Sequence, residues 1–320
     1  MLAPPLFSRT DRSTLPLFAT ALALLAAACG NTADPESSSE ADAMTPALSA
    51  DTPVIFITGS TSGLGREAAR ALAADGAHII VHGRNVEAGN ALVDELNAGP
   101  GSARFFPADL ASMAATRELA RAVLNKYDRL DAFVSNAGIF LDPADGRRVS
   151  DDGHELHFHV NYLAGFLLTR ELLPLLRETA AREGEARIIQ VASVAQAAID
   201  FDDVTLEEEG ANPRAYSQSK LAQIMFTRDL AEELESTGVL AVSLHPATLM
   251  DTGMVLDRGI EPRASVEEGL EALLNLVRSD GLEPGGYYRG LVLDEPNAQA
   301  SDREARERLR LLSEELTGVR

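Results

Sequence analysis

The sequence predicts a single α/β domain with a doubly wound, mainly parallel sheet of seven strands. From residue 54 onward, short apolar runs alternate with longer stretches of helical period. Continuous apolar runs are typical of strands buried on both faces, and their alternation with helices favours a parallel sheet. The expected strands lie at residues 54–58, 77–82, 103–107, 130–135, 186–192, 239–244 and 287–293.

Helical periodicity fills the segments between these strands. Residues 215–230 form one amphipathic pattern, and a last one covers residues 302–316. Pro174 lies inside the periodic stretch 151–177. Because proline removes a backbone hydrogen bond from a helix, we expect a bend or an interruption there.

The composition fits a soluble globular domain over most of the chain. With 320 residues and 45% hydrophobic content, the chain can bury a large core. Its formal net charge of -21 repels phosphate backbones and anionic membrane surfaces, which argues against nucleic acid as a partner.

The amino terminus differs from the rest of the chain. Arg9 and Arg12 precede an uncharged, mostly apolar run at 15–28, which is too short to span a bilayer and suits a signal peptide. The run ends in Leu25-Ala26-Ala27-Ala28-Cys29, which resembles a bacterial lipoprotein processing site, although Ala26 stands where that signal usually has leucine. Cys29 is the only cysteine, so no intramolecular disulfide can form.

Three regions follow from this pattern. We expect residues 1–29 to be a signal peptide with a lipobox-like cysteine, 30–52 a disordered linker and 53–320 the folded domain. The protein would then be exported and anchored to a membrane through a lipidated Cys29. The alternative is a leader without function, or a wrongly assigned start codon, on a cytoplasmic protein.

A glycine-rich turn joins the first expected strand to the first helix, with the sequence Thr58-Gly59-Ser60-Thr61-Ser62-Gly63-Leu64-Gly65. Glycines there let the backbone approach a pyrophosphate, and the helix amino terminus supplies N–H donors and a positive dipole. The glycine spacing resembles the TGxxxGxG motif of the short-chain dehydrogenases/reductases, which are Rossmann-fold oxidoreductases. The resemblance implies cofactor contacts from Gly59, Ser60, Ser62, Gly63, Leu64 and Gly65.

The second strand ends in His82-Gly83-Arg84-Asn85. An NAD-binding enzyme usually has an acid here that holds the ribose 2′-hydroxyl. An arginine can instead meet a 2′-phosphate, so Arg84 and Asn85 favour NADP over NAD. The alternative is a surface arginine that opens the next helix.

Other stretches match positions where this family contacts its cofactor. Asp109 and Leu110 follow the third strand, and Asn136-Ala137-Gly138 ends the fourth, with Ser135 in place of the family's first asparagine. Thr252 matches a threonine that usually touches the nicotinamide carboxamide. Ala247 stands where the family usually has a glycine, which puts the local nicotinamide contact in question.

Tyr216 and Lys220 lie four residues apart in the amphipathic stretch 215–230, which stacks their side chains on one helical face. A neighbouring cation favours the phenolate and lowers the pKa of a tyrosine, so this pair can serve as an acid or a base. Taken alone, the pattern also fits an exposed tyrosine beside a solvated lysine.

The resemblance extends over roughly residues 54–318 and looks like the retinol-dehydrogenase-like branch of the family. It implies a catalytic set of Asn161, Ser193, Tyr216 and Lys220. In that set Tyr216 exchanges the proton, and Lys220 lowers its pKa and holds the nicotinamide ribose. Ser193 orients the substrate oxygen, and Asn161 completes the proton path.

The sequence therefore predicts an NADP-dependent oxidoreductase that moves hydride between nicotinamide and a carbonyl or alcohol carbon of a small molecule. Apolar residues at 195–201 and 249–260 favour a lipophilic substrate, unless they only pack these loops onto the core. The alternative function is a catalytically silent nucleotide-binding sensor or scaffold tethered to a membrane. No metal is expected, because His154, His157 and His159 lack HExxH spacing. A homo-oligomer is left open.

Overall fold

The computed structural model describes residues 48–142, 146–207 and 213–319. The predicted signal peptide, Cys29 and most of the predicted linker therefore lie outside the described residues. Within the described residues, Leu48 already packs against the core, a few residues before the first strand. Among the described segments, none of the helices combines the length and the apolar composition that a membrane crossing requires.

The domain is built on one sheet of eight strands in the order β3-β2-β1-β4-β5-β6-β7-β8. All neighbouring pairs are parallel except β7 and β8. The strands are β1 (Val54–Ile57), β2 (His78–Gly83), β3 (Ser102–Pro107), β4 (Ala132–Ser135), β5 (Ala186–Val191), β6 (Val239–His245), β7 (Tyr287–Arg289) and β8 (Val292–Asp294). This order confirms the predicted doubly wound sheet, and the strand order reverses between β1 and β4.

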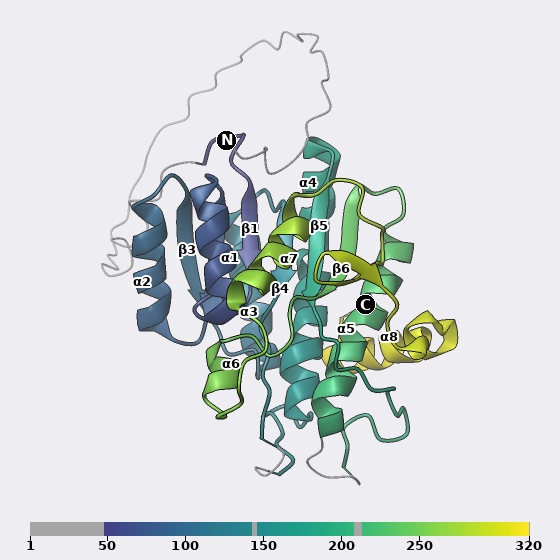
Figure 1. Ribbon diagram of the computed structural model, residues 1–320. Helices are drawn as coiled ribbons and strands as arrows, with labels where there is room; N and C mark the ends of the chain where they lie inside the picture. Colours follow the sequence, from purple (N-terminus) through teal and green to yellow (C-terminus); the bar gives the residue numbers. More distant parts are fainter. Residues whose placement is uncertain (1–47, 143–145, 208–212, 320) are drawn as a thin grey trace, which may run out of the picture.

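Helices cover both faces of the sheet, as Figure 1 shows. One core cluster joins the sheet to α1 (Gly63–Ala74), α2 (Val86–Asn97) and α7 (Val266–Arg278). A second cluster, on the opposite face, joins it to α3 (Met113–Lys126), α4 (Ala164–Glu183), α5 (Pro213–Glu233) and α8 (Arg303–Thr317). The remaining elements are the π-helix η2 (Phe158–Leu163), the short helix α6 (Gly253–Leu256) and the 3₁₀ helix η3 (Ala298–Ser301).

The predicted number of strands was wrong by one. The run at 287–293 was expected to form a single strand, but it turns at Gly290, whose φ is +60°. Glycine adopts this left-handed conformation without a steric penalty. The run therefore folds into the antiparallel β7–β8 hairpin, which leaves β8 as the sheet edge.

Of the two alternatives expected at Pro174, the interruption was wrong, because α4 continues through this residue, and the bend stays a prediction. Leu172, Leu173, Leu175 and Leu176 are buried around it. Burying such side chains stabilises the fold by roughly 1.5–3 kcal/mol each, which together exceeds the cost of about 3 kcal/mol for an internal proline. The irregular turn lies earlier, where η2 precedes α4.

Candidate active site

The glycine-rich turn after β1 has the geometry of a phosphate cradle. Gly59 and Gly63 have φ values of +65° and +52°. A Cβ on Gly65 would lie 2.6 Å from the carbonyl oxygen of Gly59, so a larger residue would force the turn open. Ser62 precedes α1 without capping it through its side chain, which leaves the first N–H groups of the helix to other acceptors. The turn fits a pyrophosphate on these grounds.

Ser60 and His82 hold this turn from beneath. The hydroxyl of Ser60 donates to the Ile57 carbonyl at 2.9 Å and accepts the N–H of His82 at 3.0 Å. The N–H of Gly59 donates to Nδ1 of His82 at 3.1 Å. Burial lowers the pKa of His82 to about 4, so the ring stays neutral and can accept this bond. Ser60 and Leu64 are both buried, so a ligand would meet the backbone of the turn at these positions.

Asn136 joins the ends of β1 and β4 across the point where the strand order reverses. Its Nδ2 donates to the carbonyl of Thr58 at 2.8 Å. The backbone N–H groups of Asn136 and Ala137 both donate to the hydroxyl of Thr58, at 3.0 Å each. Ligands bind at this switch point in open α/β sheets, so these bonds shape the floor of the candidate site.

Arg84 and Asp109 lie at the carboxyl ends of β2 and β3, close to the glycine turn. Their charged atoms are 3.9 Å apart, and the side chains are 70% and 54% exposed. Arg84 is thus held only loosely and is open to an anion. Asn85 caps α2, with its side-chain oxygen accepting the N–H of Ala88 at 3.0 Å. Leu110 is buried.

The four predicted catalytic side chains come together at the carboxyl end of β5. Tyr216 and Lys220 lie on α5, Ser193 follows β5, and Asn161 lies in η2. The hydroxyl of Ser193, which accepts the N–H of Ala195 at 3.0 Å, lies close enough to Tyr216 to lower the pKa of its phenol. The ammonium of Lys220 lies 5.7 Å from the centroid of the Tyr216 ring.

Burial controls the protonation of this pair. It raises the pKa of Tyr216, although the hydrogen bond from Ser193 acts in the opposite direction. It also lowers the pKa of Lys220 to about 7. Lys220 donates to the Val191 carbonyl at 2.8 Å and to the Gln223 side chain at 2.9 Å. Burial is thus the largest influence on the pKa of Tyr216, and the expectation that Lys220 lowers this pKa stays a prediction.

Asn161 acts as a clamp between the segment after β4 and helix α5. Its Oδ1 accepts the N–H of Ile139 at 2.7 Å, and its Nδ2 donates to the Ile139 carbonyl at 3.1 Å. The same Nδ2 donates to the hydroxyl of Ser219 at 3.0 Å, and this hydroxyl donates to the Tyr216 carbonyl at 2.7 Å. Asn161 thus ties the helix that bears Tyr216 to residues 138–141.

The sequence did not point to Phe140 and His157, which contact Tyr216, or to Arg258, which contacts Phe140. The Phe140 ring packs against the Tyr216 ring with 5.0 Å between centroids, and the Arg258 guanidinium lies 5.1 Å from the Phe140 centroid. The His157 ring lies 6.2 Å from that of Tyr216. The only signal for Phe140 is its position directly after Asn136-Ala137-Gly138. His157 was considered only as a metal ligand, and the described residues contain no group of three or more ligating side chains placed to hold a metal.

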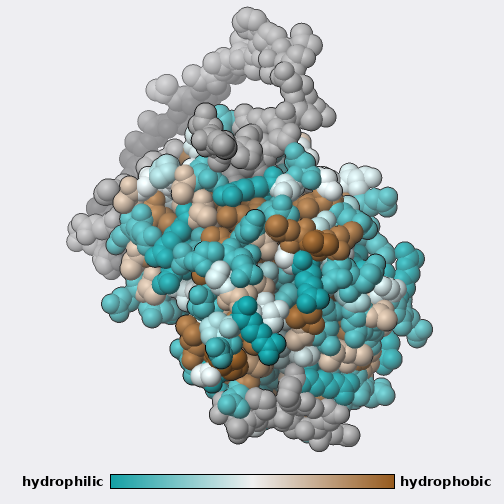
Figure 2. All heavy atoms as spheres, viewed as in Figure 1, coloured by the Kyte–Doolittle hydropathy of each residue, from teal (hydrophilic) through white to brown (hydrophobic). Residues whose placement is uncertain are grey.

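The apolar segments at 195–201 and 249–260, which the sequence analysis related to a lipophilic substrate, differ in their exposure to solvent. Ile199 is buried, and Phe201 packs against the core and beneath Arg308 of α8, so these two side chains belong to the core. Met254 and Leu256 on α6 are 38% and 51% exposed. Figure 2 shows apolar atoms on the surface over α6. Thr252 directly precedes α6, and a Cβ on Gly63 would lie 3.4 Å from the Thr252 methyl group, so the start of α6 adjoins the glycine turn.

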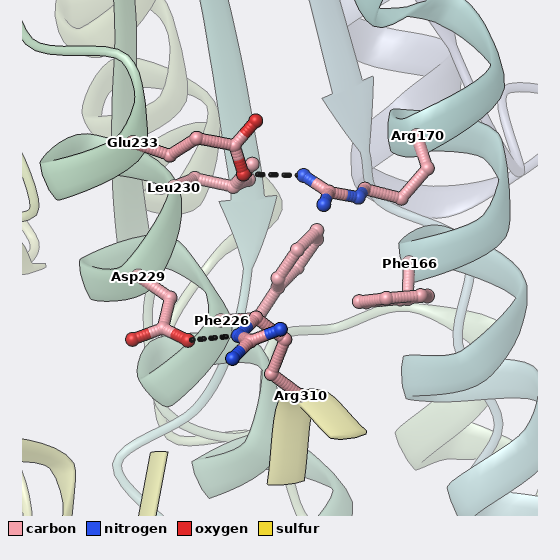
Figure 3. Close-up of a pocket in the computed structure, with 7 residues that line it drawn as sticks. All are labelled: Phe166, Arg170, Phe226, Asp229, Leu230, Glu233 and Arg310. Carbon is pink, nitrogen blue, oxygen red and sulfur yellow. Dashed lines mark hydrogen bonds and ion pairs between the residues drawn. The ribbon is translucent and has the colours of Figure 1, made fainter. Parts of the chain in front are cut away.

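A separate hollow of about 310 Å³ lies between α4, α5 and α8 (Figure 3). Its two aromatic rings, Phe166 and Phe226, are 4.8 Å apart. Its charges are paired across the hollow, with Arg170 bonded to Glu233 and Arg310 facing Asp229. None of the predicted catalytic or cofactor residues lines this hollow.

Fold and sequence together define the class of protein. The model of the short chain dehydrogenase family matches residues 53–261, and the chain belongs to that family. It is an oxidoreductase that acts on CH–OH or C=O groups.

Individual members of the family are also similar to this chain. Retinol dehydrogenase 12 of Mus musculus is 32% identical over 83% of this chain and 86% of its own length. Polyprenol dehydrogenase of Mus musculus is 34% identical over 83% of this chain and 84% of its own length. Among solved structures, the Pseudomonas aeruginosa RhlG/NADP active-site complex has a TM-score of 0.60 and 28% identity, covering 77% of this chain and 97% of that one.

Proposed function

We propose that this protein reduces the carbonyl group of a lipophilic substrate with NADPH, using Tyr216 as the proton donor. The observation that carries the proposal is the closeness of Ser193 to Tyr216, with Lys220 beside them, at the carboxyl end of β5. A silent sensor would have no need of this arrangement.

The protonation of the pair supports reduction as the favoured direction. Because burial raises the pKa of Tyr216, its phenol keeps its proton at neutral pH. A bound nicotinamide dinucleotide supplies or accepts hydride at C4 of its ring. The Ser193 hydroxyl orients the substrate carbonyl oxygen, and Tyr216 Oη gives that oxygen its proton as the alcohol forms. Lys220 then stabilises the phenolate, and Asn161 holds the residues around it in place.

The cofactor proposed is NADP, with NAD as the weaker candidate. Arg84 is exposed next to the glycine turn and its nearest carboxylate, that of Asp109, is 3.9 Å away. A 2′-phosphate would offer a shorter, charge-assisted hydrogen bond. A solved relative that contains NADP agrees with this choice.

Arg84→Ala should raise the dissociation constant for NADPH by about ten- to a hundredfold, because one charge-assisted bond is lost. Affinity for NADH, which has no 2′-phosphate, should change by less than about twofold. Titration of the fluorescence of each reduced cofactor measures both values. Equal losses for NADPH and NADH would show that Arg84 supports the fold and does not select the cofactor.

The proposed substrate class rests on α6 and on the relatives. Met254 and Leu256 present exposed apolar side chains on α6, which follows Thr252, the residue beside Gly63 of the glycine turn. Two relatives are named for retinol and polyprenol, which are large apolar alcohols. With NADPH, kcat/KM should rise along a series of aldehydes from butanal to decanal and be high for retinal, since each buried methylene contributes about 0.8 kcal/mol. A preference for glyceraldehyde or pyruvate would contradict the class while leaving hydride transfer intact.

The location proposed is a membrane surface outside the cytoplasm, with Cys29 as the lipidated anchor. Cys29→Ser should leave the precursor unprocessed or move the protein from the membrane fraction to the soluble fraction, because the chain has no second thiol. Fractionation and mass spectrometry of the amino terminus measure this. Recovery of wild-type protein in the cytoplasm with residues 1–28 attached and no lipid would refute the anchor.

A further inference from the structure

Two buried polar residues, Glu155 and His157, lie beside Tyr216 and have no role in the chemistry described above. Their exposures are 4% and 6%. The His157 ring meets that of Tyr216 edge-on, with 6.2 Å between centroids and 83° between planes. Burying a carboxyl and an imidazole costs free energy unless their polar atoms are bonded. The hydrogen-bond partners of Glu155 and His157 therefore indicate the role of these two residues.

The hydrogen bonds fix the tautomer of His157. The backbone N–H of Leu141 donates to its Nε2 at 3.0 Å. Because a backbone N–H can only donate, the ring proton lies on Nδ1. Nδ1 then donates to Oε1 of Glu155 at 2.8 Å, while Oε2 of Glu155 accepts the N–H of Phe158 at 2.8 Å. Glu155 thus connects the ring of His157 to the first turn of η2.

The segment that carries Phe140 is consequently held on both sides of this residue. Asn161 binds the N–H and the carbonyl of Ile139, and His157 binds the N–H of Leu141. Phe140 lies between these two anchors, and its ring packs on that of Tyr216 at 5.0 Å with an angle of 61°. The Tyr216 ring therefore contacts both the Phe140 ring and the His157 ring.

We propose that His157 is a positioning residue for the reaction, supported by Glu155. It holds Phe140 against Tyr216 and packs on Tyr216 itself, so that the phenol keeps the one orientation in which it meets Ser193. This inference rests on the proposed role of Tyr216 as the proton donor. Small errors in the position of a reacting group can cost about a hundredfold in rate, so loss of this support should reduce turnover while leaving the cofactor site unchanged.

Two substitutions of His157 separate positioning from general stability. Leucine at this position makes neither bond, so His157→Leu should lower kcat by about 10- to 100-fold. His157→Gln can accept the Leu141 N–H through its side-chain oxygen and donate to Glu155 through its amide, so it should recover to within about threefold of wild type. Neither change should move the NADPH dissociation constant by more than about twofold, because the glycine turn and Arg84 are untouched.

The measurements are kcat, KM and NADPH affinity with decanal and with retinal. His154→Gln is the matched control, because His154 lies on the same segment and its described ring contact is with His159. This control should keep the wild-type kcat. The proposal is overturned if His157→Leu keeps more than half of the wild-type kcat, or if His157→Gln is as slow as His157→Leu.

A second readout does not depend on the substrate. In protein labelled with ¹⁵N-histidine, which contains six histidines, the signals missing from His157→Gln identify His157. These signals should show the Nδ1–H tautomer at pH 7.5, and the Nε2–H tautomer would overturn the proposal. If Tyr216→Phe is inactive while His157→Leu is active, only the positioning role fails. If Tyr216→Phe stays active, the proposed function itself fails.

Discussion

Tyr216→Phe should lower kcat by about 10²- to 10⁴-fold while NADPH binds with unchanged affinity. The phenol lies close to Ser193 and its raised pKa keeps the proton in place, so its hydroxyl can donate to a substrate oxygen that Ser193 holds. Phenylalanine keeps the ring and its contacts with Phe140 and His157 but has no proton to give. Single-turnover measurement of NADPH oxidation separates this loss from any change in product release.

Tyr127→Phe is the matched control for this experiment. Tyr127 is also a buried tyrosine, but it is bonded to His78 at the amino end of β2, whereas the candidate site lies at the carboxyl ends of the strands. Its substitution should cost about 1 kcal/mol of stability and leave kcat unchanged. A Tyr216→Phe variant that keeps more than a tenth of the wild-type rate would remove Tyr216 from the mechanism.

Lys220→Met should lower kcat by about 10²- to 10³-fold and also weaken NADPH binding about tenfold. The ammonium would stabilise the phenolate left by proton transfer and hold the nicotinamide ribose, so one substitution removes both contributions. Lys126, the other lysine of the chain, lies at the end of α3, and Lys126→Met should affect neither quantity. Loss of turnover without any loss of NADPH affinity would contradict the ribose contact.

The same variant predicts an effect of pH on stability. Burial lowers the pKa of Lys220 from 10.5 to about 7, so the folded protein loses this proton near pH 7 and the unfolded chain keeps it until about pH 10.5. Between these values the unfolded state binds more protons, and the free energy of unfolding of the wild type should rise with pH. Relative to Lys220→Met, the rise should reach up to about 4 kcal/mol. Urea unfolding of both proteins at pH 6, 8 and 10 measures it, and a constant difference would show that Lys220 has an ordinary pKa.

The sequence was sufficient for the class of sheet, which is doubly wound and mainly parallel, and for the positions of most of its strands along the chain. Apolar runs and helical periodicity depend on local composition, which is why residues 186–192 and 215–230 correspond to β5 and α5. The β7–β8 hairpin was missed because its residues look like one apolar run and only the backbone of Gly290 divides them. The course of α4 through Pro174 was missed because burial of neighbouring leucines, a tertiary effect, outweighs the local cost.

For the site, the sequence supplied a predicted set of catalytic residues, which lie together in the structure, but not the electrostatics of that set. The spacing of Tyr216 and Lys220 predicts that they share a helical face, and they do. It does not indicate how much water surrounds them, and desolvation moves the pKa of Tyr216 upward and that of Lys220 downward. Phe140 and His157 reach Tyr216 from segments that precede it by more than 50 residues, so no local pattern connects them.

Because η2 is a π-helix, the geometry of the candidate site depends on the number of residues in this turn as well as on their identity. In a π-helix the hydrogen bonds skip one residue more than in an α-helix, so the turn at 158–163 holds an inserted residue. Each α-helical residue turns the chain by about 100°, so a deletion among residues 158–160 would rotate Asn161 relative to His157 and Glu155. Related chains with one residue fewer between positions 157 and 161 would then direct the Asn161 side chain differently relative to the segment after β4. A deletion in this turn can therefore alter the candidate site even where every site residue is kept.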